Sequence, residues 1–286
     1  MQFTQYKNIK EFHNMVYPVM IKHEAQNIVS LGNVVLGLNG NNRFGEPENW
    51  LMATVSDENG ILLTAIMTPP FNVTLYATNN KINQDAVKVL VSGLENTAIP
   101  GVVTEKNLAE CFATAYTAQH GKAFNIKTKQ RIYELTEVSQ SIPTIGQLRP
   151  VCENDMYFFP FWKEAFNAAA SYSAQSMAMP LDSATYLERI NSNTIYILEV
   201  GGMPVSMVGT SRTLATVVGI GQVYTPPYYR GKGYASSAVA QLSQQMLDKG
   251  FTKCALYTDL ANPTSNSIYQ KIGYTPICDS LDIAFE

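Results

Sequence analysis

From Ile220 to Ala235 the chain reads IGQVYTPPYYRGKGYA: a strand-like run, two prolines, and a turn with two glycines and two cations. The prolines end the strand because proline lacks the N–H that a sheet ladder needs. A helix pattern follows, and the first N–H groups of a helix have no partner within it, so its positive end favours an anion. Gly231 and Gly233 let the backbone approach that anion closely. The turn therefore predicts a phosphate-binding site.

Two common phosphate motifs do not match this turn. In a P-loop, Ser or Thr follows the Gly-Lys pair, whereas Lys232 is followed by Gly233. A dinucleotide fingerprint needs a third glycine and an early strand of a βαβ unit, and this part of the sequence has neither.

The pattern Arg-x-x-Gly-x-Ala at 230–235 instead resembles the pyrophosphate loop of the GNAT superfamily of acyl-CoA-dependent N-acyltransferases. A second segment, NPTSNSIYQKIGY from Asn262 to Tyr274, resembles the last helix of that family and the turn beyond it. The two motifs stand in the family's order, and the resemblance covers Leu148 to Phe285. It implies an α/β fold with a mixed sheet.

Length and composition bound the rest of the molecule. A chain of 286 residues with 46% hydrophobic and 15% charged residues has enough apolar side chains for two globular domains. A net charge of −3 indicates no general attraction to nucleic acid or to an anionic membrane. No run of eighteen apolar residues and no signal-peptide pattern is present, so we expect no membrane association.

Cysteine and histidine usage argue against a metal site. The four cysteines (Cys111, Cys152, Cys254 and Cys278) are far apart and show no metal-ligand spacing. We interpret them as reduced, mostly buried thiols, which is typical of a cytoplasmic protein. The composition thus favours a small anionic ligand without a metal ion.

The expected elements of the second half run as follows: helices at 154–170 and 183–190, a hairpin at 194–200 and 205–212, a strand at 216–225, a helix at 235–249, a strand at 254–258, a helix at 265–272 and a final strand at 281–285. The first half shows a similar order, with helices within 6–30, strands at 50–55, 61–67 and 71–77, a helix at 85–94, a strand at 101–103, a helix at 107–118 and extended chain at 124–138. We therefore predict a tandem repeat, with domains at 1–140 and 147–286 and a linker at 139–147.

The first half lacks a counterpart of the phosphate loop. Element order pairs the strand at 72–77 with the one at 220–225, and the residues that follow are Thr78 to Asn83, TNNKIN, with no glycine and one lysine. We interpret the first domain as a degenerate GNAT-like repeat without a cofactor loop, present for the acceptor or for stability.

The resemblance also implies roles for individual residues. Val223 and Thr225 would lie along the pantetheine arm of acetyl-CoA, and Asn262 would also contact that arm. The pyrophosphate would be held by the residues of the loop, namely Arg230, Gly231, Lys232, Gly233, Tyr234 and Ala235. Tyr269 would be the general acid that protonates the departing CoA thiolate, since a phenol stays protonated at neutral pH.

The general base is left open between Glu199 near the end of a hairpin strand, Asp259 after the strand at 254–258, and a water molecule. Either carboxylate could instead be a cap or a surface charge. All three histidines lie in the first half, which disfavours a Ser-His or Cys-His nucleophile in the second domain and favours direct attack by the amine.

Three functions are compatible with these residues. The first is an N-acetyltransferase that uses acetyl-CoA and a small-molecule or peptide amine, the acceptor amine itself being unspecified. The second is a non-catalytic acyl-CoA-binding or sensing protein, and the third is a protein that binds another phosphate ligand such as a nucleotide. The presence of both the loop and the tyrosine favours the enzyme, because a pure binder needs only the loop. The aromatic stretch from Tyr157 to Phe161 is a further candidate for the acceptor site, and the oligomeric state is not specified.

Overall fold

The computed structural model describes residues 1–41, 44–169 and 183–286. The chain forms two compact units. Unit 1 consists of Met1–Tyr133, Tyr257–Pro263 and Pro276–Glu286, and unit 2 of Glu134–Leu256 and Thr264–Thr275. Each unit is described by itself below.

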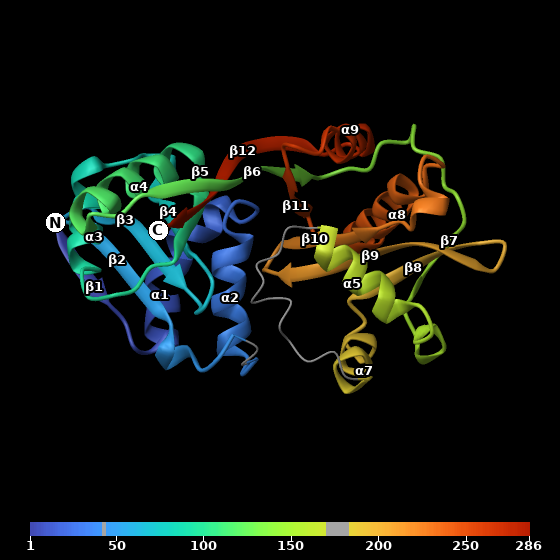
Figure 1. The fold of residues 1–286 in the computed structure, drawn as a ribbon, viewed down its shortest axis with the longest axis horizontal. Coiled ribbons are helices and arrows are strands. Elements are labelled where there is room, and N and C mark those ends of the chain that lie inside the picture. The colour runs from blue at the N-terminus through green and yellow to red at the C-terminus, as the bar shows by residue number, and fades with distance from the viewer. Residues whose placement is uncertain (42–43, 170–182) are drawn as a thin grey trace. The chain divides into compact units, whose positions relative to one another are not determined.

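The two halves of the chain contain the same order of elements (Figure 1). The first half runs β1 (Gln2–Gln5), α1 (Ile9–Met20), α2 (Ile28–Leu38), β2 (Leu51–Asp57), β3 (Gly60–Met67), β4 (Val73–Ala77), α3 (Gln84–Gly93), β5 (Gly101–Glu105), α4 (Lys106–His120) and β6 (Phe124–Leu135). The second half runs β7 (Gln147–Pro150), α5 (Phe159–Ala169), α7 (Ser183–Asn191), β8 (Ile195–Val200), β9 (Met203–Thr213), β10 (Val217–Tyr224), α8 (Tyr234–Asp248), β11 (Lys253–Asp259), α9 (Pro263–Ile272) and β12 (Thr275–Phe285). The predicted mixed α/β tandem fold is confirmed, and the predicted end of the helix at 170 lies outside the described residues.

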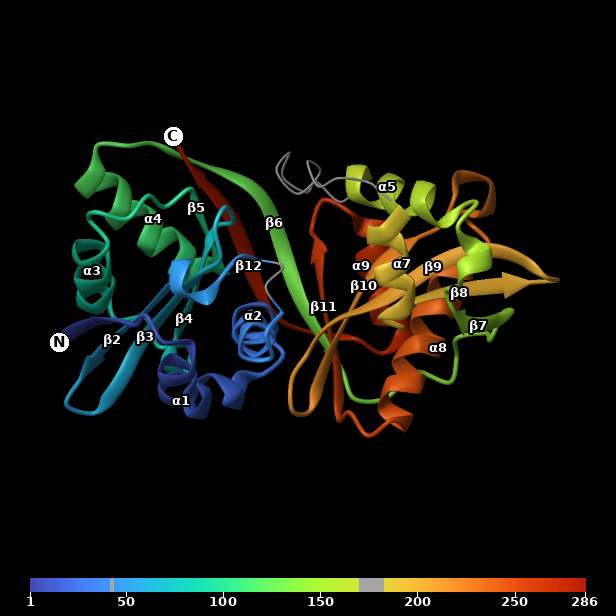
Figure 2. The same ribbon diagram turned by 90° about the horizontal axis from the view of Figure 1, so that it is seen from below.

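The sheet of unit 2 has the strand order β11-β10-β9-β8-β7. Its strands are antiparallel except β10 and β11, which are parallel. Helices α5 and α7 cover one face, where Phe159, Tyr186, Ile197 and Met207 are buried together, and α8 covers the other (Figure 2). Alternate residues of each strand point to opposite faces, so each strand supplies both layers.

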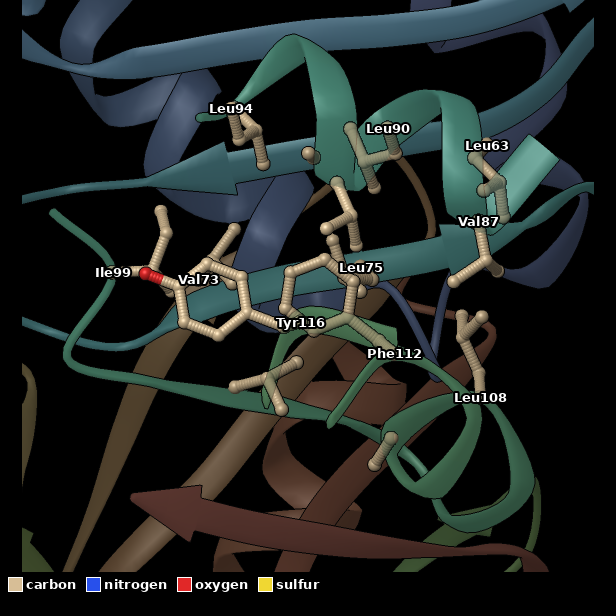
Figure 3. Packing of buried hydrophobic residues seen from close by; sticks show 14 of the residues in the cluster. Leu63, Val73, Leu75, Val87, Leu90, Leu94, Ile99, Leu108, Phe112 and Tyr116 are labelled. Carbon is tan, nitrogen blue, oxygen red and sulfur yellow. The ribbon is translucent and has the colours of Figure 1, made fainter. Parts of the chain in front are cut away.

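The sheet of unit 1 has the order β1-β2-β3-β4-β5-β12-β6. Helices α3 and α4 pack on one face through a cluster that includes Leu75, Val87, Leu90, Phe112 and Tyr116 (Figure 3). The core is continuous across the strands because Leu51, Ala53 and Val55 alternate toward the same face.

The last strand of the second half is part of unit 1. Ser280–Ala284 of β12 pair antiparallel with β5, and Leu281 and Ile283 are buried in the core of unit 1. The end of β6, in turn, belongs to unit 2, where the Glu134 carboxylate forms an ion pair with the Lys253 ammonium at 2.9 Å. The units are therefore discontinuous in sequence, whereas the expected domains 1–140 and 147–286 are contiguous. Without β12, strand β5 would have one unpaired side, and here the strand that pairs with that side comes from the other half of the chain.

The predicted linker is partly ordered against helix α8. The backbone N–H of Ile145 donates to the hydroxyl of Ser237 at 2.8 Å, and that hydroxyl donates to the Ile145 carbonyl at 3.0 Å. Ser237 is buried in the first turn of α8, so the residues before β7 help to frame the start of this helix.

Among the described residues, no helix is long and apolar enough to cross a membrane.

Candidate active site

The predicted phosphate turn lies between β10 and α8. Gly231 and Gly233 have φ angles of 75° and 79°, in the left-handed region that glycine adopts without steric cost. Gly233 is the N-cap of α8 and, having no side chain, it makes no capping hydrogen bond of its own. The first N–H groups of α8 thus have no side-chain cap from the described residues, which leaves the positive end of the helix available to an anion.

The side chains of Arg230 and Lys232 contact residues within the turn and at its start. The Arg230 guanidinium Nε donates to the Thr225 carbonyl at 2.9 Å, and the Thr225 hydroxyl lies 2.8 Å from the Ser206 hydroxyl. The Lys232 ammonium lies 5.9 Å from the ring centroid of Tyr229. Arg230 and Lys232 remain exposed, so both add positive charge where the helix begins.

Strand β10 carries a bulge before the turn. Its residues Gly221 and Tyr224 pair with Gly209 and Met207 of β9, so three steps on β10 oppose two on β9. Gln222 lies within this bulge with a φ of 55°, a conformation that costs a non-glycine residue about 1 kcal/mol or more. A bulge bends its strand and redirects the backbone groups that follow it.

The parallel register between β10 and β11 is short. It joins Val217–Gly219 to Lys253–Ala255, whereas β10 continues to Tyr224. Val223 and Thr225 lie beyond this register, half-buried at the end of the strand. Their backbone is placed where an extended ligand could continue the sheet in the manner of an added strand.

Tyr269 lies on α9, in unit 2. Its ring packs edge-on against Tyr274 with a centroid distance of 5.9 Å, and the Tyr274 hydroxyl lies 2.8 Å from the Ser243 hydroxyl. Burial raises the pKa of Tyr269 to about 12. The phenol is therefore held protonated over the whole physiological range, as a proton donor requires.

Asn262 and Asp259 belong to the segment Tyr257–Pro263, which is grouped with unit 1. The Asp259 carboxylate accepts a hydrogen bond from the N–H of Ala261 at 2.8 Å, and its carbonyl accepts one from the N–H of Asn262 at 3.1 Å. Asp259 thus serves the turn that leads into α9. Its possible role as a base stays a prediction.

Glu199 has a structural partner. Its carboxylate forms an ion pair with Arg149 at 2.7 Å, and the same guanidinium binds Asp155 through two bonds of 2.6 and 2.8 Å. Burial opposes ionisation of Asp155, but the bonds from Arg149 and from the Cys152 N–H outweigh it and lower the pKa of Asp155. Glu199 lies on β8, two strands from β10, and its role as general base stays a prediction.

The comparisons with known proteins concern this same segment. Residues 159–274 match the model of the acetyltransferase (GNAT) family. This segment belongs to the GNAT family. No curated protein matches the chain.

Solved GNAT proteins share the fold of the whole chain. An acetyltransferase of the GNAT family from Colwellia psychrerythraea is 11% identical with a TM-score of 0.60, covering 100% of this chain and 99% of its own. A GCN5-related N-acetyltransferase from Sphaerobacter thermophilus is 13% identical with a TM-score of 0.60, covering 99% and 95%. A tandem GNAT protein from the clavulanic acid biosynthesis pathway is 11% identical with a TM-score of 0.55, covering 100% and 98%. At such identities the likeness concerns the fold, and it supports the tandem interpretation.

The first GNAT-like repeat differs from the second at the helix start and at the bulge, although the parallel register of its β4 with β5 is also short. Helix α3 begins with a side-chain cap, because the Asn83 side chain accepts hydrogen bonds from the backbone N–H groups of Asp85 and Ala86 at 3.0 and 3.1 Å. Strand β4 pairs with β3 in an unbroken register from Thr74 to Ala77, without a bulge. Asp85 also places a negative charge in the first turn of the helix, which disfavours an anion there.

The described residues leave only a small cavity beside β4 of the first repeat. A cavity of about 30 Å³ lies among α2, β4 and β5, lined in part by Ser30, Thr74, Leu75 and Thr104. It has room for roughly one or two water molecules. The Tyr257 hydroxyl donates to the Gln26 carbonyl at 2.8 Å beside it. These features favour the interpretation of the first repeat as one without a cofactor site.

Two polar residues of the GNAT segment were not singled out from the sequence. Lys163 is only 7% exposed on α5, and the Gln222 Oε1 atom is buried with no hydrogen-bond partner among the described residues. A sequence signal existed for Lys163, because it lies at a core-facing position between Phe159 and Phe166. No signal marked Gln222, since a bulge is not visible in the amino-acid pattern. Among the described residues no group of three His, Cys, Asp or Glu side chains could hold a metal ion.

Proposed function

We propose that the second repeat, 147–286, is an N-acetyltransferase that transfers the acetyl group of acetyl-CoA to a primary amine by direct attack. The observation that carries the proposal is the start of α8, where a glycine turn takes the place of a side-chain cap. The matching helix of the first repeat, α3, has its cap, so the difference is specific to the repeat that matches the family model.

The residues fit acetyl-CoA as follows. The backbone of the loop from Arg230 to Ala235 would hold the pyrophosphate, and the exposed Lys232 adds charge. The end of β10 at Val223 and Thr225 would accompany the pantetheine arm, since its register with β11 ends at Gly219. Asn262 is proposed as a further contact to that arm. The thioester supplies the activated acyl group, and the protein positions it.

Tyr269 is proposed as the general acid. When the amine nitrogen bonds to the carbonyl carbon and the C–S bond breaks, the departing sulfur takes a proton from the Tyr269 hydroxyl. The raised pKa of Tyr269, about 12, keeps that proton in place. The ammonium formed on the acceptor must also lose a proton. Because Glu199 is tied to Arg149, we favour a water molecule as the first carrier of this proton over Glu199 or Asp259.

A free-thiol release assay with acetyl-CoA and a panel of amines tests this function. We expect thiol release that depends on both the enzyme and an amine, with mass spectrometry showing one added acetyl group on the product. Saturable acetyl-CoA binding without thiol release from any amine would instead support an acyl-CoA-binding protein. Stabilisation by ATP but not by CoA would support a different phosphate ligand.

A further inference from the structure

Helix α5 carries a lysine where its pattern calls for an apolar residue. Phe159, Trp162 and Phe166 form its sheet-facing stripe at helical spacing, and they belong to or pack against the cluster with Ile195 and Ile197. Lys163 lies on the same stripe and is 7% exposed. Lysine is almost never buried this far unless it is paired, and positions that break the local pattern are often functional.

The Lys163 ammonium forms no ion pair with the residues that the structure describes. Among the described residues, it donates to the neutral Asn167 side chain at 3.0 Å and lies 5.1 Å from the Phe166 ring centroid. The nearby carboxylate of Glu164 instead accepts from the Tyr186 hydroxyl at 3.1 Å. No described Asp or Glu lies within ion-pair distance of Lys163.

The charges around Lys163 leave an excess of positive charge. Burial, and next the like charge of Arg189 on α7, lower the pKa of Lys163 to about 8, while Glu164 opposes the shift. Trp162, Phe166 and Asn167 beside it are only half-buried, so the ammonium lies just beneath the surface of the α5–α7 layer. A ligand that brings a negative charge would relieve this arrangement.

A buried acceptor without a donor lies on the same face of the sheet. Gln222 is in the bulge of β10, and its Nε2 atom lies 3.1 Å from the point where Gly209 would carry a Cβ atom. Ile195 adjoins that same point and belongs to the α5–α7 cluster, so the Gln222 amide is on this face. Its Oε1 atom has no donor among the described residues.

Helix α5 contacts the strand that carries Gln222. The Trp162 ring lies 6.1 Å from the ring of Tyr224, two residues after Gln222 on β10. As far as the described residues go, the layer therefore offers a cation without a counter-ion from a helix and an acceptor without a donor from the strand proposed to hold the acyl group. An amine that also bears a carboxylate complements both.

We infer that the acceptor is an amino acid or a similar amino-carboxylate, whose carboxylate binds Lys163 and whose amino group donates to the Gln222 Oε1 atom. This inference rests on the proposed acetyl transfer and narrows its substrate class. Lys163 is a binding residue in this scheme, and Gln222 a positioning residue. A charge-assisted bond between ammonium and carboxylate is stronger than a neutral one, so the carboxylate would decide which amines bind.

The test compares amino acids with their carboxamides in the thiol-release assay. Each carboxamide keeps the amino group and loses the negative charge, and its amine is the less basic of the pair, so intrinsic availability of the free amine favours the amide. We expect kcat/KM for at least one amino acid to exceed that of its amide by about tenfold or more. In Lys163→Met this preference should disappear through a higher KM for the acid, while the amide is unaffected.

Two further variants separate binding from other roles. Lys163→Arg should keep the preference for the acid, because a guanidinium also binds a carboxylate. Gln222→Leu should slow acetylation of the amino acid and of its amide by the same factor, since both present the same amino group. Thermal unfolding of Lys163→Met should be no lower than that of the parent protein, which would show that any lost activity is not lost folding.

The outcomes are distinguishable. If no amine releases thiol, the proposed function itself is wrong. If amines are acetylated but acids and amides react equally, or if Lys163→Met slows both alike, the transferase stands and the inference about the carboxylate is overturned.

Discussion

Two tyrosines, Tyr269 on α9 and Tyr274 just after it, lie in different surroundings. Tyr274 is 2% exposed and its hydroxyl is bonded to Ser243, whereas Tyr269 is half-buried and is the residue proposed above as the general acid. Burial is the reason that the pKa of Tyr269 rises. Adjacent residues of one type can thus be separated into a proposed donor and a structural contact.

Tyr269→Phe is expected to lower kcat by about a hundredfold, the usual contribution of a positioned acid, and to leave the Kd for acetyl-CoA within a few-fold. The matched control is Tyr274→Phe, which should lower stability by about 1–3 kcal/mol because Ser243 loses a buried partner, with kcat retained. Rate assays, calorimetric binding and thermal unfolding measure the three quantities. Equal kcat in Tyr269→Phe and the parent protein would remove Tyr269 from the mechanism.

The buried Lys163 predicts a dependence of stability on pH. Its pKa is lowered from 10.5 to about 8 on folding, so between these values the unfolded chain binds more protons than the folded one. Stability should therefore rise with pH across pH 8 to 10.5, by at most an amount on the order of 3 kcal/mol. Below pH 8 the destabilisation is fully present.

Denaturant unfolding of the parent protein and of Lys163→Met at several pH values measures this effect as a difference. Groups other than Lys163 titrate in both proteins and cancel. The free energy of unfolding of the parent protein should increase relative to that of Lys163→Met as pH rises from 8 to 10.5. A difference that does not change with pH would contradict a buried ammonium without a counter-ion.

At the scale of elements, the corresponding helices of the two repeats begin in different ways. Helix α8 begins at Gly233 with a left-handed φ and no side-chain cap, whereas α3 begins at Asn83 with two capping bonds. A capped helix has fewer N–H groups to offer an anion. One difference at the cap therefore distinguishes the repeat with the proposed cofactor loop from the other repeat.

Gly233→Ala should weaken acetyl-CoA binding by about tenfold or more, since a residue other than glycine resists the left-handed φ by about 1 kcal/mol or more. The added Cβ would meet only Ile145 at an ordinary 3.4 Å, so folding should survive. The control Asn83→Ala should cost about 1 kcal/mol of stability with unchanged acetyl-CoA binding. Unaltered binding in Gly233→Ala would argue against the loop as the phosphate site.

At the scale of the molecule, unit 1 is completed by the end of the chain. Strand β12 pairs with β5 and places Leu281 and Ile283 in the core of unit 1. Loss of one large buried apolar side chain typically costs 2–5 kcal/mol, which is a large part of the stability of a domain. The first half of the sequence is therefore not a complete folding unit.

Removal of residues 276–286 is expected to unfold or strongly destabilise unit 1 while unit 2 keeps its structure. Amide hydrogen exchange measures this locally. Protection should fall at β5 and in the core helices α3 and α4, and persist in β8 and β9 of unit 2. Retained protection at β5 would show that another segment takes the place of β12.

The sequence by itself determined the family of the second half, the loop with its glycines, and the repeated order of elements. These features are local, because they depend on glycine and proline conformations, periodicity and short motifs that neighbouring residues carry. The lack of a phosphate loop in the first repeat is likewise a prediction from local sequence, since Thr78 to Asn83 contain no glycine.

Only the tertiary structure decided how the strands are shared and which polar groups lack partners. The pairing of β12 with β5 joins residues 175 to 183 positions apart, which no local pattern specifies. The bulge at Gln222 depends on register with β9, and the role of Glu199 depends on Arg149 fifty residues away. That Lys163 has a neutral partner, Asn167, and no counter-ion among the described residues likewise follows from what packs around α5. Register, burial and charge pairing are properties of contacts between distant segments, and so they come with the fold.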